Sequence, residues 1–410
     1  MRSLLAAFVA ALVAIPAAGA WTTISTGTLQ NIVDPSALRT RSGTELVVYD
    51  NSTAGTISLV RNGGPPRVLV SGDPIAGEAQ LLQQPSGAVQ LYFPNALGVA
   101  RLTSSDDGQS WTGPVQTQSH ATGPVESATT LPDGTPLFSQ DGTDFVNVFE
   151  GLNGEHVTNV FPSCCGYAES LAVDSAGLAQ IAFWSNANPP ENGYLYGTIG
   201  GGYANLSRGA DTVSNDNRVP LVADGAGNTF AAWFGGYPTP NAFNVQTFRG
   251  GAAIRSVTLW REFRAPSQAA LALEPDGKLW ALWTAEGAVR AARSRSDGAH
   301  FGAQVHVNLP AGATSYQLEA LARPGSVTAL VNVGDRLIAQ KLLPGLAVSV
   351  HGRTATVVDD GAGVASALAR GGGRTLHANA QGRISLVGLR HHVFLQVTAP
   401  GYTGTGFRVP

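Results

Sequence analysis

Residues 268–283, QAALALEPDGKLWALW, contain two short apolar segments on either side of a Pro-Asp-Gly turn. Each segment lacks the 3.6-residue period of an amphipathic helix and has the length of a strand. A tight hairpin needs a residue with positive φ in its turn, and Gly277 can supply it. The stretch therefore predicts a β-hairpin.

The same hairpin pattern recurs along the chain at a spacing of about 40–50 residues, a period that indicates a propeller or another repeat array. Related segments are ESLAVDSAGLAQIAFW at 169–184 and VPLVADGAGNTFAAW at 219–233. Seven such units fit between residues 30 and 345, although the weak pattern of the last unit leaves six as an alternative. The turn glycines are Gly43, Gly87, Gly134, Gly177, Gly227, Gly277 and Gly325.

In a propeller each unit is a four-stranded blade, whose first strand lines a central channel. The last unit lacks an outer strand after Leu342, and residues 22–29, TTISTGTL, can supply it. Such closure removes the two free sheet edges that would otherwise promote aggregation. We therefore predict an all-β chain with a seven-bladed β-propeller, or a six-bladed one, over residues 21–345.

The composition agrees with many short strands joined by tight turns, because the 410 residues include 50 Gly and only 13% charged residues. The net charge is −3 and the basic residues are scattered, so the sequence has no basic stripe for a phosphate backbone. We expect no nucleic-acid partner. No Ser-His-Asp, zinc or phosphate-loop signature occurs, so we expect no cofactor and no metal.

Residues 1–20, MRSLLAAFVAALVAIPAAGA, have the pattern of a secretory signal peptide. Arg2 gives the positive start, an apolar stretch follows, and Ala18-Gly19-Ala20 fits a cleavage site. A retained membrane anchor is the alternative. No later segment approaches eighteen apolar residues, so we expect no membrane span after cleavage and a secreted protein, extracellular or associated with the cell envelope.

The two cysteines, Cys164 and Cys165, are adjacent. In an oxidising compartment the intrachain disulfide open to them is a vicinal one. Neighbouring Cα atoms lie about 3.8 Å apart, which is below the usual disulfide range of about 4.4–6.8 Å, so the bond would stiffen a strained turn. Two buried free thiols are the alternative.

Residues 104–111, SSDDGQSW, resemble the Asp-box, S-x-D-x-G-x-[ST]-W, of sialidase-like β-propellers. In such a turn Asp and Ser side chains bond the backbone, Gly takes the left-handed corner, and Trp packs between sheets. Residues 294–301, SRSDGAHF, form a degraded copy. The resemblance implies that both turns are structural and lie away from the functional face.

From about residue 346 the pattern changes, and the tail resembles a carboxypeptidase regulatory-like or transthyretin-like β-sandwich. The resemblance depends on Asp359-Asp360-Gly361, on the segments 364–367 and 378–383, and on Ala399-Pro400-Gly401-Tyr402. Ala378 and Ser366 depart from the family pattern. The resemblance implies a second domain over residues 346–410, of a kind that is usually non-catalytic.

Ligands of propellers usually meet the face where the inner strands begin, because residues from all blades converge there. Glu126 and Glu169 occupy equivalent positions in neighbouring units, so they are candidate catalytic residues that could share a proton as acid and base. They could equally hold water or a cation, or simply line a solvated channel. The residues near the seven strand starts are Asp34, Glu78, Glu126, Glu169, Arg218, Gln268 and Tyr316.

Two loops, 186–196 and 234–243, are long and rich in Asn, Pro, Gly and aromatic residues. Exposed aromatic rings on such loops form platforms for sugars or peptides, although packing on the blade is an equal alternative. The aromatic candidates are Tyr194, Tyr196, Trp233, Tyr237 and Phe243. The ligand-binding set predicted from strand starts, loops and motifs is Glu78, Arg218, Tyr194, Tyr237, Arg264 and Tyr316.

Arg264 enters that set because Phe263-Arg264-Ala265-Pro266 resembles the F/Y-R-I-P motif of sialidases. In that family the arginine belongs to a carboxylate-binding triad. The sequence departs from the family in the third residue of the motif and in its position, since only one unit follows it. The other two arginines and the Tyr–Glu nucleophile pair have no counterparts that can be placed, which weighs against a sialidase.

Three function classes stay open. The first is a non-catalytic extracellular binding protein that recognises a glycan or another surface polymer through the channel mouth. The second is a sialidase-like glycoside hydrolase or lyase that uses Glu126 and Glu169. The third is a structural envelope or adhesion protein whose C-terminal sandwich orients the propeller.

Overall fold

The computed structural model describes residues 20–26, 35–51, 54–72, 79–120, 123–141, 146–161, 166–188, 191–207, 218–235, 241–261 and 267–410. Their regular structure consists of strands, and none of their residues forms a helix long and apolar enough to cross a membrane. Several predictions lie outside these residues: the signal peptide up to residue 19, the disulfide of Cys164 and Cys165, and the roles of Glu78, Tyr237 and Arg264.

Seven four-stranded antiparallel sheets follow one another along the chain. The first three contain β2 (Ser36–Arg39), β3 (Glu45–Asn51), β4 (Thr56–Arg61) and β5 (Arg67–Ser71); β6 (Gln80–Gln83), β7 (Val89–Asn95), β8 (Gly98–Ser104) and β9 (Thr112–Gln116); and β10 (Val125–Thr130), β11 (Pro136–Asp141), β12 (Val146–Glu150) and β13 (His156–Phe161). The next two contain β14 (Gly166–Val173), β15 (Ala179–Ser185), β16 (Gly193–Thr198) and β17 (Tyr203–Asn205); and β18 (Leu221–Ala223), β19 (Asn228–Gly235), β20 (Ala242–Arg249) and β21 (Ala252–Arg261). The last two contain β22 (Ala269–Leu273), β23 (Leu279–Ala285), β24 (Ala288–Arg293) and β25 (Val305–Asn308); and β26 (Gln317–Arg323), β27 (Ser326–Val333), β28 (Arg336–Leu342) and β1 (Thr22–Thr26).

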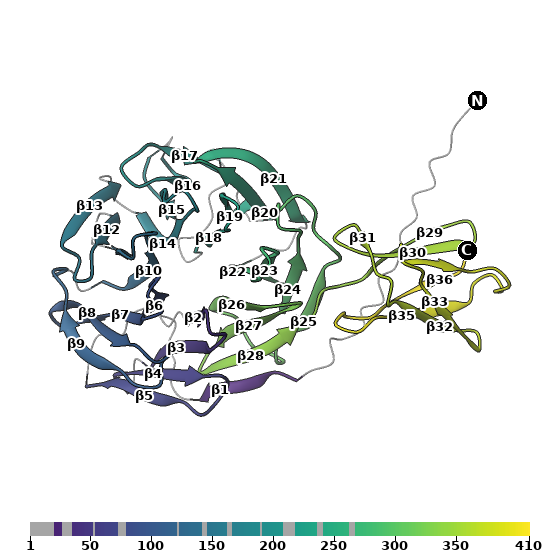
Figure 1. Cartoon of the computed structure of the whole chain (residues 1–410), viewed down its shortest axis with the longest axis horizontal. Coiled ribbons are helices and arrows are strands. Elements are labelled where there is room, and N and C mark those ends of the chain that lie inside the picture. Colours follow the sequence, from purple (N-terminus) through teal and green to yellow (C-terminus); the bar gives the residue numbers. More distant parts are fainter. Residues whose placement is uncertain are drawn as a thin grey trace.

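The sheets form a closed ring (Figure 1). The first strand of each sheet contacts the first strand of the next, from β2 through β6, β10, β14, β18 and β22 to β26, and β26 contacts β2 again. The ring is closed as the sequence predicts, because β1 pairs antiparallel with β28, with Thr22 opposite Ala339 and Thr26 opposite Arg336.

The turns between first and second strands need glycine for a physical reason. All seven predicted turn glycines have positive φ, from 71° at Gly325 to 96° at Gly134, a region that costs other residues free energy. The backbone N–H of Gly277 donates to the carbonyl of Glu274 at 2.9 Å, which closes the hairpin. The repeated Gly therefore sets where each inner strand ends.

Apolar side chains fill the wedges between neighbouring sheets. The largest such core lies between the sheets of β14–β17, β18–β21 and β22–β25, and it includes the fully buried Phe230, Phe243 and Trp283. The rings of Phe243 and Trp283 stack with centroids 4.9 Å apart. Burying one such side chain contributes roughly 1.5–3 kcal/mol, so these wedges stabilise the ring.

The turn at residues 104–111 has the hydrogen bonds that its sequence predicts. The Asp106 carboxylate accepts from the Ser110 N–H at 2.8 Å and from the Ser110 hydroxyl at 2.6 Å. Gly108 has φ of 80°, and a Cβ there would lie 2.8 Å from Leu46 of the preceding sheet. The turn follows β8 at the end of the ring opposite the starts of the inner strands, so it is a structural contact between sheets.

Residues 346–410, which we call the C-terminal module, form two further four-stranded sheets. Both sheets contribute to one apolar core that includes Ala355, Ile384 and Leu395, so they pack face to face. One sheet contains β29 (Ala347–His351), β30 (Thr354–Asp359), β31 (Ala362–Gly363) and β34 (Arg383–Ser385), and the other contains β33 (Arg374–His377), β32 (Leu368–Gly371), β35 (Phe394–Thr398) and β36 (Thr405–Arg408).

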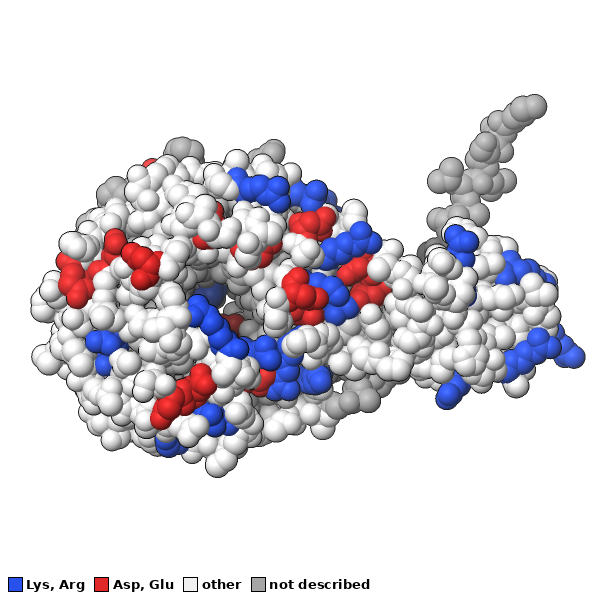
Figure 2. Space-filling view, viewed as in Figure 1, with Lys and Arg blue, Asp and Glu red and all other residues white. Residues whose placement is uncertain are grey.

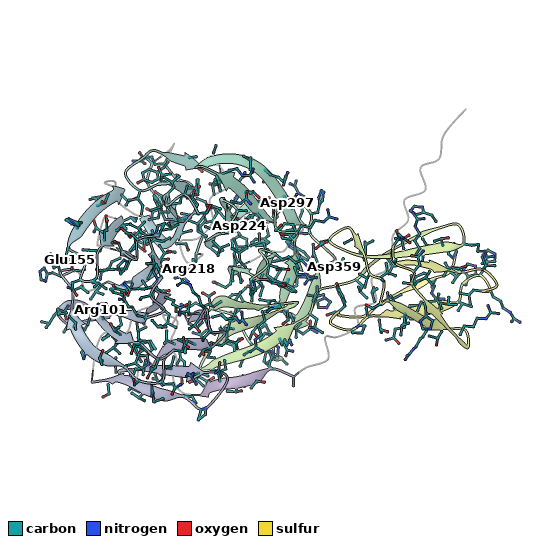
Figure 3. All side chains as sticks on the ribbon, in the orientation of Figure 1. Arg101, Glu155, Arg218, Asp224, Asp297 and Asp359 are labelled. Atoms are coloured by element: carbon teal, nitrogen blue, oxygen red, sulfur yellow. The ribbon has the colours of Figure 1, made fainter. Side chains whose placement is uncertain are left out.

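The C-terminal module meets the ring at a buried cluster of charges (Figure 3). Arg293, the last residue of β24, forms an ion pair with Asp359 of the module and lies 3.3 Å from Glu274 of the ring. All three side chains are at most 5% exposed. Burial raises the pKa of the Asp359 carboxyl, although Arg293 partly lowers it. Burial opposes the charge of Arg293, but the two carboxylates outweigh it and raise the pKa of the guanidinium.

Candidate functional site

The first strands of all seven sheets enclose a cavity of about 320 Å³ on the axis of the ring. Figure 2 shows the ring hollowed at its centre. Residues far apart in the sequence meet there, including Ser36 of β2, Gln80 of β6, Ser127 of β10, Ser170 of β14 and Glu319 of β26. The cavity therefore has the convergent arrangement of a binding site. We call the end of the ring where these strands begin the mouth.

The structure places the predicted strand-start residues at the mouth. Glu126 and Glu169 lie in β10 and β14, and Arg218, Gln268 and Tyr316 lie just before β18, β22 and β26. Asp34 and Glu78 lie outside the described residues. The backward alignment from the turn glycines therefore located residues at the starts of five neighbouring inner strands, two within the strands and three just before them.

Glu126 and Glu169 both occupy irregular positions in their strands. The register with the second strand shifts between Val125 and Ser127, and again between Tyr167 and Ser170, where Ala168 has φ of 54°. Such bulges re-aim a side chain relative to a regular strand. Glu126 is 7% exposed and Glu169 is 0% exposed, so both carboxylates are buried in the ring.

Arg218 spans the mouth end of the cavity (Figure 3). One terminal nitrogen donates to the backbone carbonyl of Glu126, and the other lies 3.7 Å from the Glu319 carboxylate. Arg218 therefore links the strand of Glu126 to that of Glu319 across the channel. The alignment missed Glu319, because counting back from Gly325 pointed to Tyr316 instead.

Two serines tie neighbouring inner strands together beside the cavity. The Ser36 hydroxyl accepts from the Leu81 N–H at 3.1 Å, and the Ser127 hydroxyl accepts from the Leu171 N–H at 2.9 Å. Gln80 lines the same cavity, and its buried amide nitrogen has no hydrogen-bond partner within the part of the chain that the structure describes. Arg218 and Gln80 thus present donors for a ligand rich in oxygen acceptors.

The aromatic predictions separate into packed and accessible residues. Tyr194 and Tyr196 of β16 and Phe243 of β20 are at most 2% exposed. They are core residues and not an exposed platform, because they fill the wedges against neighbouring sheets. Trp233 is half-buried and Tyr316 is 36% exposed. Tyr167, which the sequence did not single out, is also half-buried at the mouth, with its ring 5.7 Å from that of Trp184.

Among the described residues, no group of three or more His, Cys, Asp or Glu side chains could hold a metal ion. The rings of the adjacent His391 and His392 have centroids 6.4 Å apart, and His391 contacts Arg353.

No family model and no curated protein matches this chain. It is similar in structure to virginiamycin B lyase from Staphylococcus aureus, with 14% identity, a TM-score of 0.50, and coverage of 78% of this chain and 98% of the lyase. The NanB sialidase from Streptococcus pneumoniae shares 10% identity over 66% of this chain and 68% of its own, with a TM-score of 0.47. YCF48 bound to a D1 peptide shares 15% over 82% and 100%, with a TM-score of 0.48. At such identities the likeness concerns the fold alone, and the fold is that of a β-propeller.

Proposed function

We propose that the protein is a secreted, non-catalytic binding protein that recognises a glycan or another surface polymer through the mouth. In this proposal the seven sheets of the ring are the seven blades of one propeller, and residues 346–410 form a carboxypeptidase regulatory-like sandwich. Residues 104–111 are an Asp-box, and residues 1–20 direct export. The observation that carries the proposal is Arg218, which lies across the channel between Glu126 and Glu319.

The position of the carboxylates supports binding over hydrolysis. Glycosidases usually use two carboxyl groups that flank the scissile bond and touch the sugar. Glu169 is fully buried and Glu126 is 7% exposed, and the backbone carbonyl of Glu126 accepts a hydrogen bond from Arg218. Among the described residues, Arg218 and Gln80 line the cavity, and the two glutamates do not.

The groups around the mouth suit a hydroxyl-rich ligand. The Gln80 amide and the Arg218 guanidinium donate hydrogen bonds to hydroxyl or carboxylate oxygens. Tyr316, which is 36% exposed, offers a ring face on which a sugar can stack, and the half-buried Tyr167 and Trp233, which also pack on the core, lie nearby at the mouth. A glycan presents both kinds of surface to a protein.

A glycan array tests this proposal with the full chain. We expect hits that are lost in Tyr316→Ala, because its side chain is exposed at the mouth and its removal leaves the core intact. Leu97→Ala, at an exposed position between β7 and β8, is the matched control and should keep the hits. Hits that survive Tyr316→Ala and Arg218→Gln alike would refute a mouth site.

The equivalent bulges at Glu126 and Glu169 favour a glycoside hydrolase or lyase as the second candidate. In that case a substrate screen would detect activity that Glu126→Gln and Glu169→Gln abolish while the thermal unfolding midpoint stays near that of the parent. If neither screen gives a signal, the third class, a structural envelope or adhesion protein, is favoured.

A further inference from the structure

The charge of the chain is unevenly divided between the ring and the C-terminal module. Six of the 25 Lys and Arg residues lie in residues 346–410, but only two of the 28 Asp and Glu residues do. The module therefore has four more basic than acidic side chains, while the chain as a whole is acidic. All six basic residues are arginines: Arg353, Arg370, Arg374, Arg383, Arg390 and Arg408.

The two acidic residues of the module are used at the junction with the ring. Asp359 is 4% exposed and pairs with Arg293, and Asp360 is 6% exposed with a carboxylate oxygen 3.4 Å from Nε of Arg295. Docking therefore removes both carboxylates from the module's surface. Figure 2 shows basic patches and no acidic patch on the visible face of the module away from the junction.

All six arginines of the module are exposed, and none of them forms an ion pair with an Asp or Glu side chain within residues 346–410. Exposed arginines on a folded domain usually have carboxylates nearby, which reduce the local potential. Here both carboxylates of residues 346–410 are buried at the junction, so neither offsets the charge of the exposed arginines. The module thus presents a positive potential to any polyanion that approaches it.

One face of the module combines these charges with other sugar-binding groups. On the outer face of the sheet β33-β32-β35-β36, Arg370 lies opposite Thr375 and Gln396, and Phe394 lies opposite Arg408. Phe394 is 42% exposed, and its ring lies over Gly406, where a Cβ would come within 2.4 Å of it. Alternate residues of these strands are buried in the core of the module, so this set points outward.

We propose that this face, which we call the arginine face (Arg370, Thr375, Phe394, Gln396 and Arg408), binds an acidic polysaccharide. Guanidinium groups pair bidentately with carboxylate or sulfate groups. The hydroxyl and amide side chains between them can bond sugar hydroxyls, and the Phe394 ring can stack on a sugar face. This site is separate from the mouth and does not depend on what the mouth binds.

A polysaccharide fits better than an anionic membrane for two reasons. The exposed large apolar side chains of the module are Val387 and Phe394, which give little area for insertion into lipid. The arginines also do not lie in one plane, because Arg383 is on the outer face of the other sheet and Arg353 follows β29 at a loop. A flexible chain can follow such a distribution, whereas a flat bilayer meets one side of it.

Two sites on one chain would have a consequence for avidity. A buried ion pair between Arg293 and Asp359 joins the module to the ring, so the arginine face and the mouth lie on one docked assembly. A polymer that engages both sites binds more tightly than either site alone allows, because the second contact is intramolecular.

The test measures binding of the full chain to polygalacturonate, heparin, neutral dextran, and phosphatidylcholine vesicles with phosphatidylglycerol, at low and high salt. We expect binding to the two acidic polysaccharides that weakens with salt, and on the order of tenfold weaker binding in the double variant Arg370→Gln/Arg408→Gln. The control Arg336→Gln/Lys341→Gln removes the same charge from β28 of the ring and should change binding by less than about twofold.

Three outcomes would count against the proposal, and two controls make them interpretable. Vesicle binding without polysaccharide binding would assign the face to membranes, and no binding to any acidic probe at low salt would refute a polyanion site. Equal losses in the module variant and in the ring control would show that only net charge matters. Unchanged thermal unfolding of both double variants shows that a loss of binding is not a loss of fold. Array hits at the mouth that persist in Arg370→Gln/Arg408→Gln separate this result from the proposed function.

Discussion

Arg293 of the ring and Asp359 of the C-terminal module form an ion pair that is almost fully buried. Glu274 completes the cluster from the ring, and its second carboxylate oxygen accepts the backbone N–H of Gly325 at 2.8 Å. One guanidinium therefore bridges two carboxylates that come from different parts of the molecule. This arrangement docks the module against the ring. It also buries the carboxylate of Asp359, so the exposed charged side chains of the module are its arginines.

We predict that Arg293→Met destabilises the chain strongly. Removal of one partner from a buried ion pair leaves uncompensated charge and costs about 3–5 kcal/mol, and here two carboxylates would be left behind. Chemical denaturation at neutral pH measures the loss. The triple variant Glu274→Gln/Arg293→Met/Asp359→Asn should recover much of it, since no buried charge remains.

The same cluster predicts a pH dependence for the Arg293→Met variant. Burial raises the pKa of Asp359, so the folded state penalises the ionised carboxyl when the pH lies above that raised value. The penalty is relieved as the pH falls through it, because the folded protein then binds the proton more readily than the unfolded chain does. The stability of the variant relative to the parent should therefore improve as the pH is lowered from neutral, and a constant difference would contradict this account.

We predict that deletion of residues 20–26 promotes aggregation. These residues include β1, the outermost strand of the sheet that closes the ring, and without it β28 becomes an open edge. Size-exclusion chromatography should show larger species, and the unfolding midpoint should fall. Thr23→Ala, an exposed position in the same strand, should behave as the parent. A monomeric deletion variant of parental stability would show that closure is dispensable.

Arg218→Met should weaken ligand binding and also lower the free energy of unfolding. The variant loses the hydrogen bond to the Glu126 carbonyl and the charge that faces Glu319. Leaving buried acceptors without partners costs about 1–3 kcal/mol, measured by denaturant unfolding. Arg218→Lys keeps the positive charge but lacks the planar guanidinium with its several N–H donors. Relative to Arg218→Met, it should therefore recover more of the lost stability than of the lost binding. Full binding in Arg218→Met would remove this residue from the site.

The ring and its closing strand were predictable from the sequence because they depend on local signals. A turn glycine with positive φ and a short apolar strand recur in each unit, and counting back from the glycine reaches Glu126, Glu169 and Arg218 at the strand starts. These features need no knowledge of how distant segments pack. The period therefore predicted where the inner strands begin, although it missed Glu319 and Gln80, which line the cavity.

Tyr194 shows where local patterns mislead. The segment 186–196 is rich in Asn and Pro and suggests one long loop, but β16 begins at Gly193 and pairs Tyr194 with Trp184. Both Tyr194 and Tyr196 lie on the same side of this strand, because they are two residues apart, and that side packs in the core. The contact of Arg293 with Asp359 was equally unpredictable from the sequence, since it forms only when the C-terminal module docks on the ring.

The hydrogen bonds of the Asp106 turn predict a loss of stability in acid. Hydrogen bonds from Ser110, first from its hydroxyl and then from its N–H, lower the pKa of Asp106 to about 2. A carboxyl with a lowered folded-state pKa stabilises the protein above its unfolded value near 4, and that contribution disappears as the pH falls toward 2. Asp106→Asn should therefore lower the unfolding midpoint at neutral pH, with the difference shrinking in acid. Ser110→Ala removes the largest cause of the shift, so in that background the Asp106→Asn difference should depend less on pH, and a full dependence there would contradict the assignment.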